Sequence, residues 1–186
     1  MALTISGTSN GKLGNLSLSA NTGDILDSAN TTFFGADTWY LNTNHTTNAD
    51  ITSWTRLTSD SGGNIGSAMT VSSGIFTFPT TGVWLIVTNF MINNGTSSDD
   101  GSYVLFKSSS DNFSTTNTND AIHAWLYPVS QRATIQTGGN YMFDCTDTSN
   151  DKVKWTAASF STGNYVEGFA GNAYRSWAHF VRLGDT

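Results

Sequence analysis

The sequence predicts an all-β fold of about ten short strands, arranged as a sandwich, a jelly roll or a barrel. Thr, Val, Ile and aromatic residues are plentiful whereas Ala, Leu, Glu and Lys are sparse, a composition that favours strands over helices. Turn-forming pairs separate the apolar segments, among them Asn94-Gly95, Asp100-Gly101 and Gly138-Gly139. No segment repeats apolar residues at helical spacing. A chain of 186 residues suits one domain with a substantial core.

Residues 1–35 are expected to form an N-terminal attachment arm. They contain short apolar alternations interrupted by Gly and Asn, and no aromatic residue precedes Phe33. Residues 36–186 are expected to form the globular domain, because aromatic residues recur there at strand-like spacing. Its predicted strands are residues 37–41, 53–58, 68–78, 82–92, 102–108, 121–129, 133–137, 140–146, 152–160 and 176–183. Gly138-Gly139 predicts a two-residue hairpin between the seventh and eighth of them.

The segment from Val83 to Val87 is apolar at every position. Successive side chains of a strand point to opposite faces, so a half-exposed strand alternates apolar and polar residues. Because this segment does not alternate, we expect both of its faces to be covered.

The charge of the chain argues against a nucleic-acid partner. The formal net charge is −6, and the eight Lys and Arg residues are scattered rather than clustered as phosphate binding requires. The longest apolar run is far too short for a membrane span, and the first residues show neither the basic nor the apolar region of a signal peptide. We therefore expect no membrane insertion and no secretion signal.

No catalytic motif is recognisable, and we expect no enzymatic activity. His45 lies in a polar loop, and His123 and His179 lie in predicted strands, where core or interface histidines are commonest. Cys145, the single cysteine, lies in a strand-like apolar stretch and is expected to be buried and inert. A glycan depolymerase stays the enzymatic alternative; it would need paired Asp residues, since Glu167 is the only glutamate.

Two groups of carboxylates occur in predicted turns, where oxygen ligands could converge on Ca²⁺. Neither has the spacing of an EF-hand loop, and Asp in turns usually accepts hydrogen bonds from its own backbone. No cofactor is therefore expected, and calcium is the alternative. The groups are Asp99 with Asp100, and Asp144 with Asp147 and Asp151.

The stretch "SGIFTFPTTGVWLIVTNFMI" resembles a segment of C1q/TNF-like jelly rolls, in which G-x-F-x-x-P-x-x-G-x-Y/W runs into the central strand of the inner sheet. Gly74, Phe76, Pro79, Gly82 and Trp84 match that pattern. Residues 150–159 resemble the family's G-D-x-V strand, with Asn-Asp in place of Gly-Asp. Residues 176–184 resemble its closing strand, with histidine where glycine is usual. The resemblance covers residues 36–186.

This resemblance implies a two-sheet jelly roll that assembles as a tight homotrimer. In the family, central strands pack one face on the second sheet and lend residues of the other face, or its ends, to the threefold interface. A partner subunit would then cover the second face of residues 83–87. The expected core or interface anchors are Phe76, Phe78, Trp84, Ile86, Phe90, Trp177, His179 and Phe180.

The chain has no collagen-like repeat, and its Asn-, Thr- and Ser-rich texture resembles structural proteins of tailed bacteriophages, especially marine ones. That resemblance implies a non-enzymatic virion component, a trimer that decorates and cements the capsid. The arm would bind other virion proteins, either the major capsid protein or tail components. The alternative is a tail-fibre knob that binds host surface glycans with exposed aromatic residues.

Overall fold

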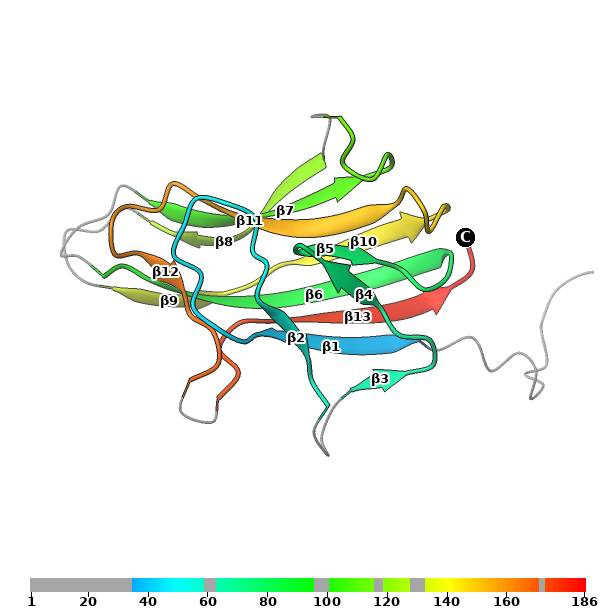
Figure 1. Ribbon diagram of the computed structural model, residues 1–186, viewed down its shortest axis with the longest axis horizontal. Helices are drawn as coiled ribbons and strands as arrows, with labels where there is room; N and C mark the ends of the chain where they lie inside the picture. The colour runs from blue at the N-terminus through cyan, green and yellow to red at the C-terminus, as the bar shows by residue number, and fades with distance from the viewer. Residues whose placement is uncertain (1–34, 59–62, 96–100, 116–118, 128–132, 171–172) are drawn as a thin grey trace, which may run out of the picture. The chain divides into compact units, whose positions relative to one another are not determined.

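The computed structural model describes residues 35–58, 63–95, 101–115, 119–127, 133–170 and 173–186 (Figure 1). These residues form two antiparallel sheets that pack face to face, one of eight strands and one of five. The described part of the chain contains no helix. The two-sheet, all-β architecture predicted from the sequence is confirmed. Except for Gly35, the predicted arm lies outside the described residues.

The eight-stranded sheet is built around a path of five strands. Their order is β10 (Asn140–Cys145), β6 (Gly82–Asn93), β13 (Trp177–Gly184), β1 (Ala36–Leu41) and β2 (Trp54–Arg56). Beside β1 lies β3 (Asn64–Ile65), and beside β6 lie β9 (Thr134–Thr137) and β12 (Tyr165–Val166). The five-stranded sheet has the order β4 (Thr70–Ser72), β5 (Ile75–Thr77), β11 (Lys152–Ala158), β7 (Ser102–Ser109) and β8 (Asn119–Leu126).

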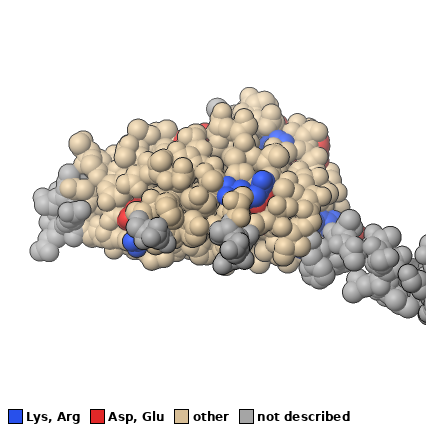
Figure 2. Space-filling view, turned by 60° about the horizontal axis from the view of Figure 1, so that its bottom comes forward, with Lys and Arg blue, Asp and Glu red and all other residues tan. Residues whose placement is uncertain are grey.

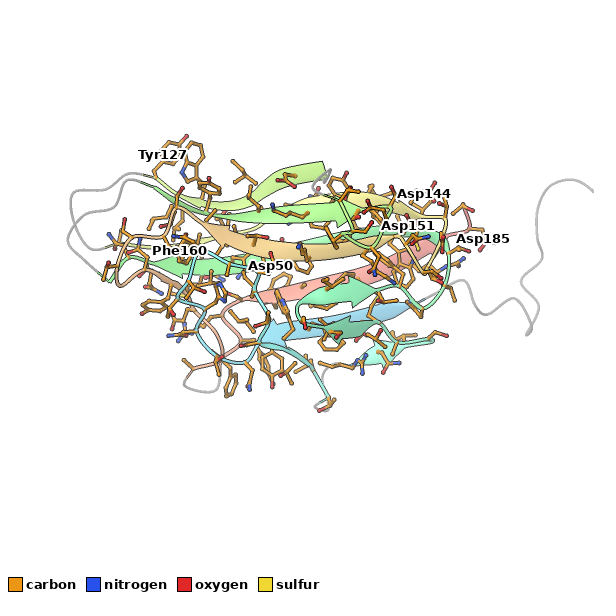
Figure 3. All side chains as sticks on the ribbon, turned by 45° about the horizontal axis from the view of Figure 1, so that its top comes forward. Asp50, Tyr127, Asp144, Asp151, Phe160 and Asp185 are labelled. Atoms are coloured by element: carbon orange, nitrogen blue, oxygen red, sulfur yellow. The ribbon has the colours of Figure 1, made fainter. Side chains whose placement is uncertain are left out.

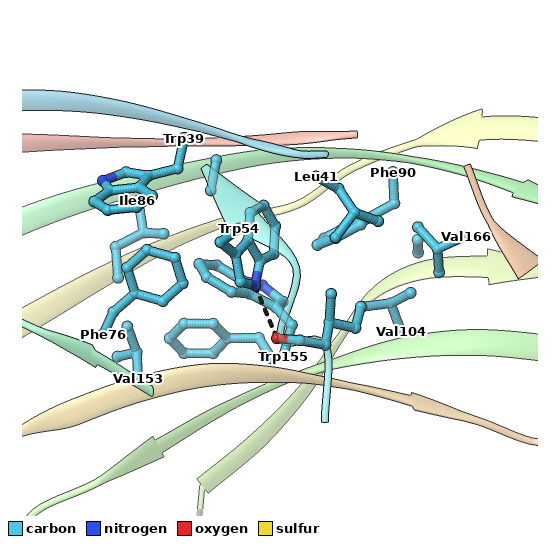
Figure 4. Close-up of a cluster of buried hydrophobic side chains, with 14 of the residues drawn as sticks. Trp39, Leu41, Trp54, Phe76, Ile86, Phe90, Val104, Val153, Trp155 and Val166 are labelled. Carbon is cyan, nitrogen blue, oxygen red and sulfur yellow. Dashed lines mark hydrogen bonds between the residues drawn. The ribbon is translucent and has the colours of Figure 1, made fainter. Parts of the chain in front are cut away.

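Aromatic rings fill the space between the sheets (Figure 4). The centroid of the Phe76 ring lies 5.4 Å from those of Trp39 and Trp155, and both contacts are edge to face. The Phe180 centroid lies 5.0 Å from that of Phe76. The indole N–H of Trp54 donates a 2.9 Å hydrogen bond to a backbone carbonyl, as Figure 4 shows. Edge-to-face contacts stabilise such a core beyond the area that it buries.

The predicted strand 68–78 is wrong as a single strand, because a hairpin divides it into β4 and β5. Ser73 and Gly74 have φ values of 50° and 83°. Two consecutive positive φ values are typical of the type I′ turn, whose twist matches that of paired strands. Gly74 is also required sterically, since a β-carbon there would lie 2.5 Å from the Ile51 carbonyl oxygen.

The predicted hairpin at Gly138-Gly139 is also wrong. β9 and β10 both pair with β6, and they keep one register along it: Thr137 lies opposite Phe90 and Asn140 lies opposite Val87. The glycines instead allow a close approach between backbones. A β-carbon at Gly138 would lie 1.8 Å from the carbonyl oxygen of Thr88.

The other predicted strands coincide with observed ones to within about three residues at each end. The sequence pattern does not predict β3 or β12, because two residues are too few to show an alternation.

Candidate subunit interface

The central strand β6 has one covered face and one open face. Trp84, Ile86 and Phe90 point between the sheets and are at most 1% exposed. The residues of odd number from Val83 to Met91 point away from the second sheet and are half-buried. We call this side of the eight-stranded sheet its outward face. The sandwich thus covers one face of the apolar segment and leaves the other to solvent.

An unbroken row of apolar residues crosses the outward face. Each member lies directly opposite the next on the neighbouring strand, from β10 through β6, β13 and β1 to β3. The end members, on β10 and β3, are 55% and 65% exposed. Water-facing sides of antiparallel sheets are normally polar, so such a row indicates a surface that something else covers. We call this set the apolar row: Met142, Leu85, Val181, Ala36 and Ile65.

The rest of the outward face is almost free of charge. In the register beside the apolar row, Asn140, Val87, His179 and Thr38 follow one another across four strands. Among the outward side chains of β1, β6, β10 and β13, Asp144 is the single carboxylate, and none is Lys or Arg. Depletion of charge is the compositional mark of the core of a protein interface.

An aromatic cluster occupies one end of this face. The Tyr40 ring lies 4.6 Å from Tyr174 and 5.9 Å from Phe169. Next to it, Trp177 lies 4.3 Å from the His179 imidazole. A pocket of about 240 Å³ lies at this cluster. Its lining residues are Thr38, Tyr40, Leu57, Tyr174, Trp177 and His179. Apolar walls with a few hydroxyl groups suit an inserted side chain from a partner.

His179 is the polar centre of the outward face. Its Nδ1 lies 2.9 Å from the Thr38 hydroxyl, and partial burial lowers the pKa of the imidazole below its usual 6.5. The ring is therefore neutral at pH 7, and the face that it shares with Val87 and Trp177 carries no positive charge.

No protein-family profile and no curated protein matches the sequence. Solved structures do share the architecture. Eiger TNF from S. frugiperda superposes with a TM-score of 0.60 at 12% identity, over 82% of this chain and 94% of that one. The crystal structure of murine APRIL at pH 8.0 superposes with a TM-score of 0.54 at 9% identity, over 81% of this chain and 99% of that one. The fold is a TNF-like jelly roll. At these identities the likeness is one of fold.

Within the TNF-like jelly roll, the eight predicted anchors fall into two groups. Trp177 and His179 lie on the outward face, half-buried. The other six are at most 1% exposed and form part of the core between the sheets; they are Phe76, Phe78, Trp84, Ile86, Phe90 and Phe180.

The apolar row itself contains none of the predicted anchors. Leu85 belongs to the segment that is apolar on both faces, so the sequence carried a signal for it. Ile65 is a single apolar residue between Asn64 and Gly66, and Met142 lies in a strand whose apolar residues alternate little with polar ones. Only the strand register brings the two into line with Leu85.

His123 and Cys145 are both buried, and burial shifts the pKa of each. Burial lowers the pKa of His123 to about 4 and raises the pKa of the Cys145 thiol to about 11, so one is neutral and the other protonated at pH 7. Within the described ranges, no three His, Cys, Asp or Glu side chains gather as a metal site requires. The same ranges contain no helix able to cross a membrane.

The carboxylates between β10 and β11 close a turn. Asp151 accepts the backbone N–H groups of Thr146 and Asp147 at 2.6 and 2.8 Å, and Asp147 accepts that of Ser149 at 2.8 Å. Figure 3 places Asp144 and Asp151 at the end of the domain where the chain terminates. Asp99 and Asp100 lie outside the described residues.

Proposed function

We propose that this chain is the subunit of a closed homotrimer that serves as a non-enzymatic structural protein of a tailed-bacteriophage particle, where it decorates and cements the capsid. The observation that carries the self-association is the outward face, which has an apolar row and, on β1, β6, β10 and β13, Asp144 as its one charged side chain. Such a face is costly to leave in water and is stabilised by burial against another protein surface.

The dimensions of the outward face suit a subunit interface. Five strands spaced about 4.8 Å apart give a width of roughly 20 Å, and the stretch from Val83 to Met91 gives a length of roughly 27 Å. The resulting area, on the order of 500 Å², approaches the roughly 800 Å² that each partner contributes to a stable interface. A second copy is the natural partner, because soluble oligomers are mostly closed assemblies of identical chains.

A trimer is favoured over other closed assemblies by the C1q/TNF-like motif around Gly74 and Trp84, whose family assembles in threes. The phage particle is favoured by the Ser-, Thr- and Asn-rich texture and the low content of charge. Figure 2 shows a surface on which Lys, Arg, Asp and Glu occur only in small groups between large uncharged areas. Residues 1–35 would bind the major capsid protein or a tail component.

Sedimentation equilibrium of the purified chain at micromolar concentration tests the assembly. The chain mass is 20.0 kDa, so a trimer has a mass of about 60 kDa, three times that value. A monomer at this concentration contradicts the proposal, and a dimer contradicts the threefold arrangement.

A second candidate function is a tail-fibre knob that binds host surface glycans. Trp125 and Tyr127 favour it, because both residues are exposed to solvent, at 40% and 63%. Aromatic rings beside hydrogen-bonding groups suit ligands that have an apolar body and a polar rim.

A further inference from the structure

Trp125 and Tyr127 form a stacked pair on the sheet opposite to the apolar row. Their ring centroids lie 4.3 Å apart with an angle of 16° between the planes. Trp125 belongs to β8, the edge strand of the five-stranded sheet, and Tyr127 directly follows that strand. Figure 3 shows Tyr127 at one end of the domain, far from Asp144 and Asp185 at the other end. We call these two residues the aromatic pair.

A β-bulge turns the aromatic pair toward solvent. Val104 pairs with Ala124 and Leu105 pairs with Ile122, so His123 is an extra residue in β8. His123 and Ala124 therefore both point into the core, at 4% and 2% exposure. Strict alternation from His123 would instead send Trp125 and Tyr127 inward and leave Ala124 and Leu126 outside. Bulges that redirect side chains are enriched next to functional sites.

The bulge is anchored from inside the core. The His123 imidazole stacks on Phe106 at 4.8 Å and 9°, and its Nδ1 accepts the indole N–H of Trp155 at 3.3 Å. These contacts fix the residue that redirects the strand. The aromatic pair is consequently held in position before any ligand arrives, which lowers the entropic cost of binding.

The surroundings of the aromatic pair indicate a small, neutral ligand. Two lysines on the same sheet face already have carboxylate partners: Lys107 pairs with Asp120 at 3.4 Å and Lys154 with Asp50 at 2.9 Å. The exposed surface of the two residues is on the order of 200 Å² in total, well below the roughly 800 Å² that a protein partner requires. Tyr103 lies opposite Trp125 and adds a phenolic hydroxyl, a group that both donates and accepts hydrogen bonds.

We propose that the aromatic pair is a binding site for the pyranose ring of a neutral glycan. A pyranose has a flat face of C–H groups that packs on an aromatic ring, and a rim of hydroxyls that bonds to the phenols of Tyr127 and Tyr103. Binding of this kind requires no phosphate, carboxylate or basic group on the ligand. The inference rests on the second candidate function, glycan binding, to which it gives a site and a ligand class, and it uses none of the residues of the outward face.

Calorimetric titration of the full chain with neutral hexasaccharides tests the site. The probes are cellohexaose, laminarihexaose, chitohexaose and mannohexaose, with hexagalacturonate as the anionic comparison. We expect at least one neutral probe to bind with a Kd of about 1 mM, as befits a shallow site on two rings. Trp125→Ala and Tyr127→Ala should each weaken that binding at least about tenfold.

Ile122→Ala is the matched control, because Ile122 is 54% exposed on the same strand but is not aromatic. It should leave the Kd unchanged. The proposal is overturned if no neutral probe binds below about 10 mM, if hexagalacturonate binds best, or if the control variant loses as much affinity as the aromatic variants. The sedimentation mass of each variant separates these outcomes from a failure of the proposed trimer, which concerns the other sheet.

Discussion

The indole N–H of Trp155 donates a 3.3 Å hydrogen bond to Nδ1 of His123, and so holds the imidazole as an acceptor in the core. The Thr88 hydroxyl lies 3.0 Å from the same nitrogen. A nitrogen that accepts a hydrogen bond carries no proton, so the ring is neutral, with its proton on Nε2. Protonation of Nδ1 would break the bond from Trp155 and bury a positive charge.

This arrangement predicts that the protein loses stability in mild acid. Burial lowers the pKa of His123 from 6.5 to about 4 in the folded chain. Between these values the unfolded chain binds more protons than the folded one, so the free energy of unfolding falls as the pH drops from about 6.5 to about 4. A shift of this size corresponds to about 3 kcal/mol. Urea denaturation at pH 7.5 and pH 4.5 measures most of this loss, which is complete only below about pH 4.

The variant His123→Leu isolates this effect. His45 and His179 also have lowered pKa values, because of burial, and they add to the acid sensitivity of the whole chain. In the variant, the pH dependence of the free energy of unfolding should lose the contribution of His123 and keep those of His45 and His179. An identical pH dependence in the variant and the natural chain would show that His123 is not buried as described.

Trp84 is expected to be a main contributor to the stability of the core. The residue is 1% exposed and packs on the Phe78 ring at 5.4 Å. Trp84→Ala removes a large buried side chain and should lower the free energy of unfolding by about 3–5 kcal/mol. Chemical denaturation measures it, with Ile122→Ala as a control that should change stability by less than about 0.5 kcal/mol. An unchanged midpoint for Trp84→Ala would contradict the placement of β6.

Gly138 is expected to tolerate no side chain. A β-carbon there would lie 1.8 Å from the Thr88 carbonyl oxygen, so Gly138→Ala must push β9 away from β6. We expect a loss of about 2 kcal/mol or more in the free energy of unfolding. Gly35→Ala is the control, because the nearest atom to its β-carbon would be 3.4 Å away. Equal stability of the two variants would contradict the continuous pairing along β6.

Gly138 and His123 also show what the sequence could and could not predict. Alternation within each segment was sufficient to predict an all-β sandwich and most strand positions. A Gly-Gly pair, however, is typical both of a tight turn and of a close backbone approach. The choice between them depends on β6, a strand some 50 residues away. A one-residue bulge such as that at His123 cannot be recognised in the sequence of its own strand, because the bulge is defined by the pairing with the neighbouring strand.

The candidate interface was predictable to a smaller extent. The run of apolar residues around Leu85 indicated a covered outer face, since alternation fails there. Val181 and Met142 each lie in strands whose own pattern is ordinary, and their alignment with Leu85 follows from the register of three strands. Side-chain burial inside the sandwich could not be told apart from burial between subunits by sequence alone.

Leu85→Lys should dissociate the proposed trimer without unfolding the chain. Leu85 is half-buried at the centre of the apolar row, so a lysine can reach water in a monomer but not in an interface. An unpaired charge buried between subunits costs several kcal/mol, enough to weaken association at least about a hundredfold. Sedimentation should give about 20 kDa in place of about 60 kDa, with an unchanged circular dichroism spectrum.

Leu105→Lys is the matched control for this variant. Leu105 is also half-buried on a strand, but it points outward from the five-stranded sheet, where Lys107 is already tolerated. That variant should keep the mass of the natural chain. A trimeric Leu85→Lys variant would show that the outward face is not the interface.

The copy number per particle decides between capsid decoration and a tail fibre. Fibre tips are usually held away from the particle by a shaft of repeats or coiled coil, a pattern that residues 1–186 do not show. The predicted arm, residues 1–35, spans at most roughly 120 Å when fully extended. A trimer with three short arms suits the threefold and quasi-threefold positions that an icosahedral shell offers many times over.

Quantitative mass spectrometry of purified particles, scaled to the major capsid protein, should therefore find on the order of hundreds of copies. A few dozen copies or fewer would contradict capsid decoration and make glycan binding at a tail the leading function.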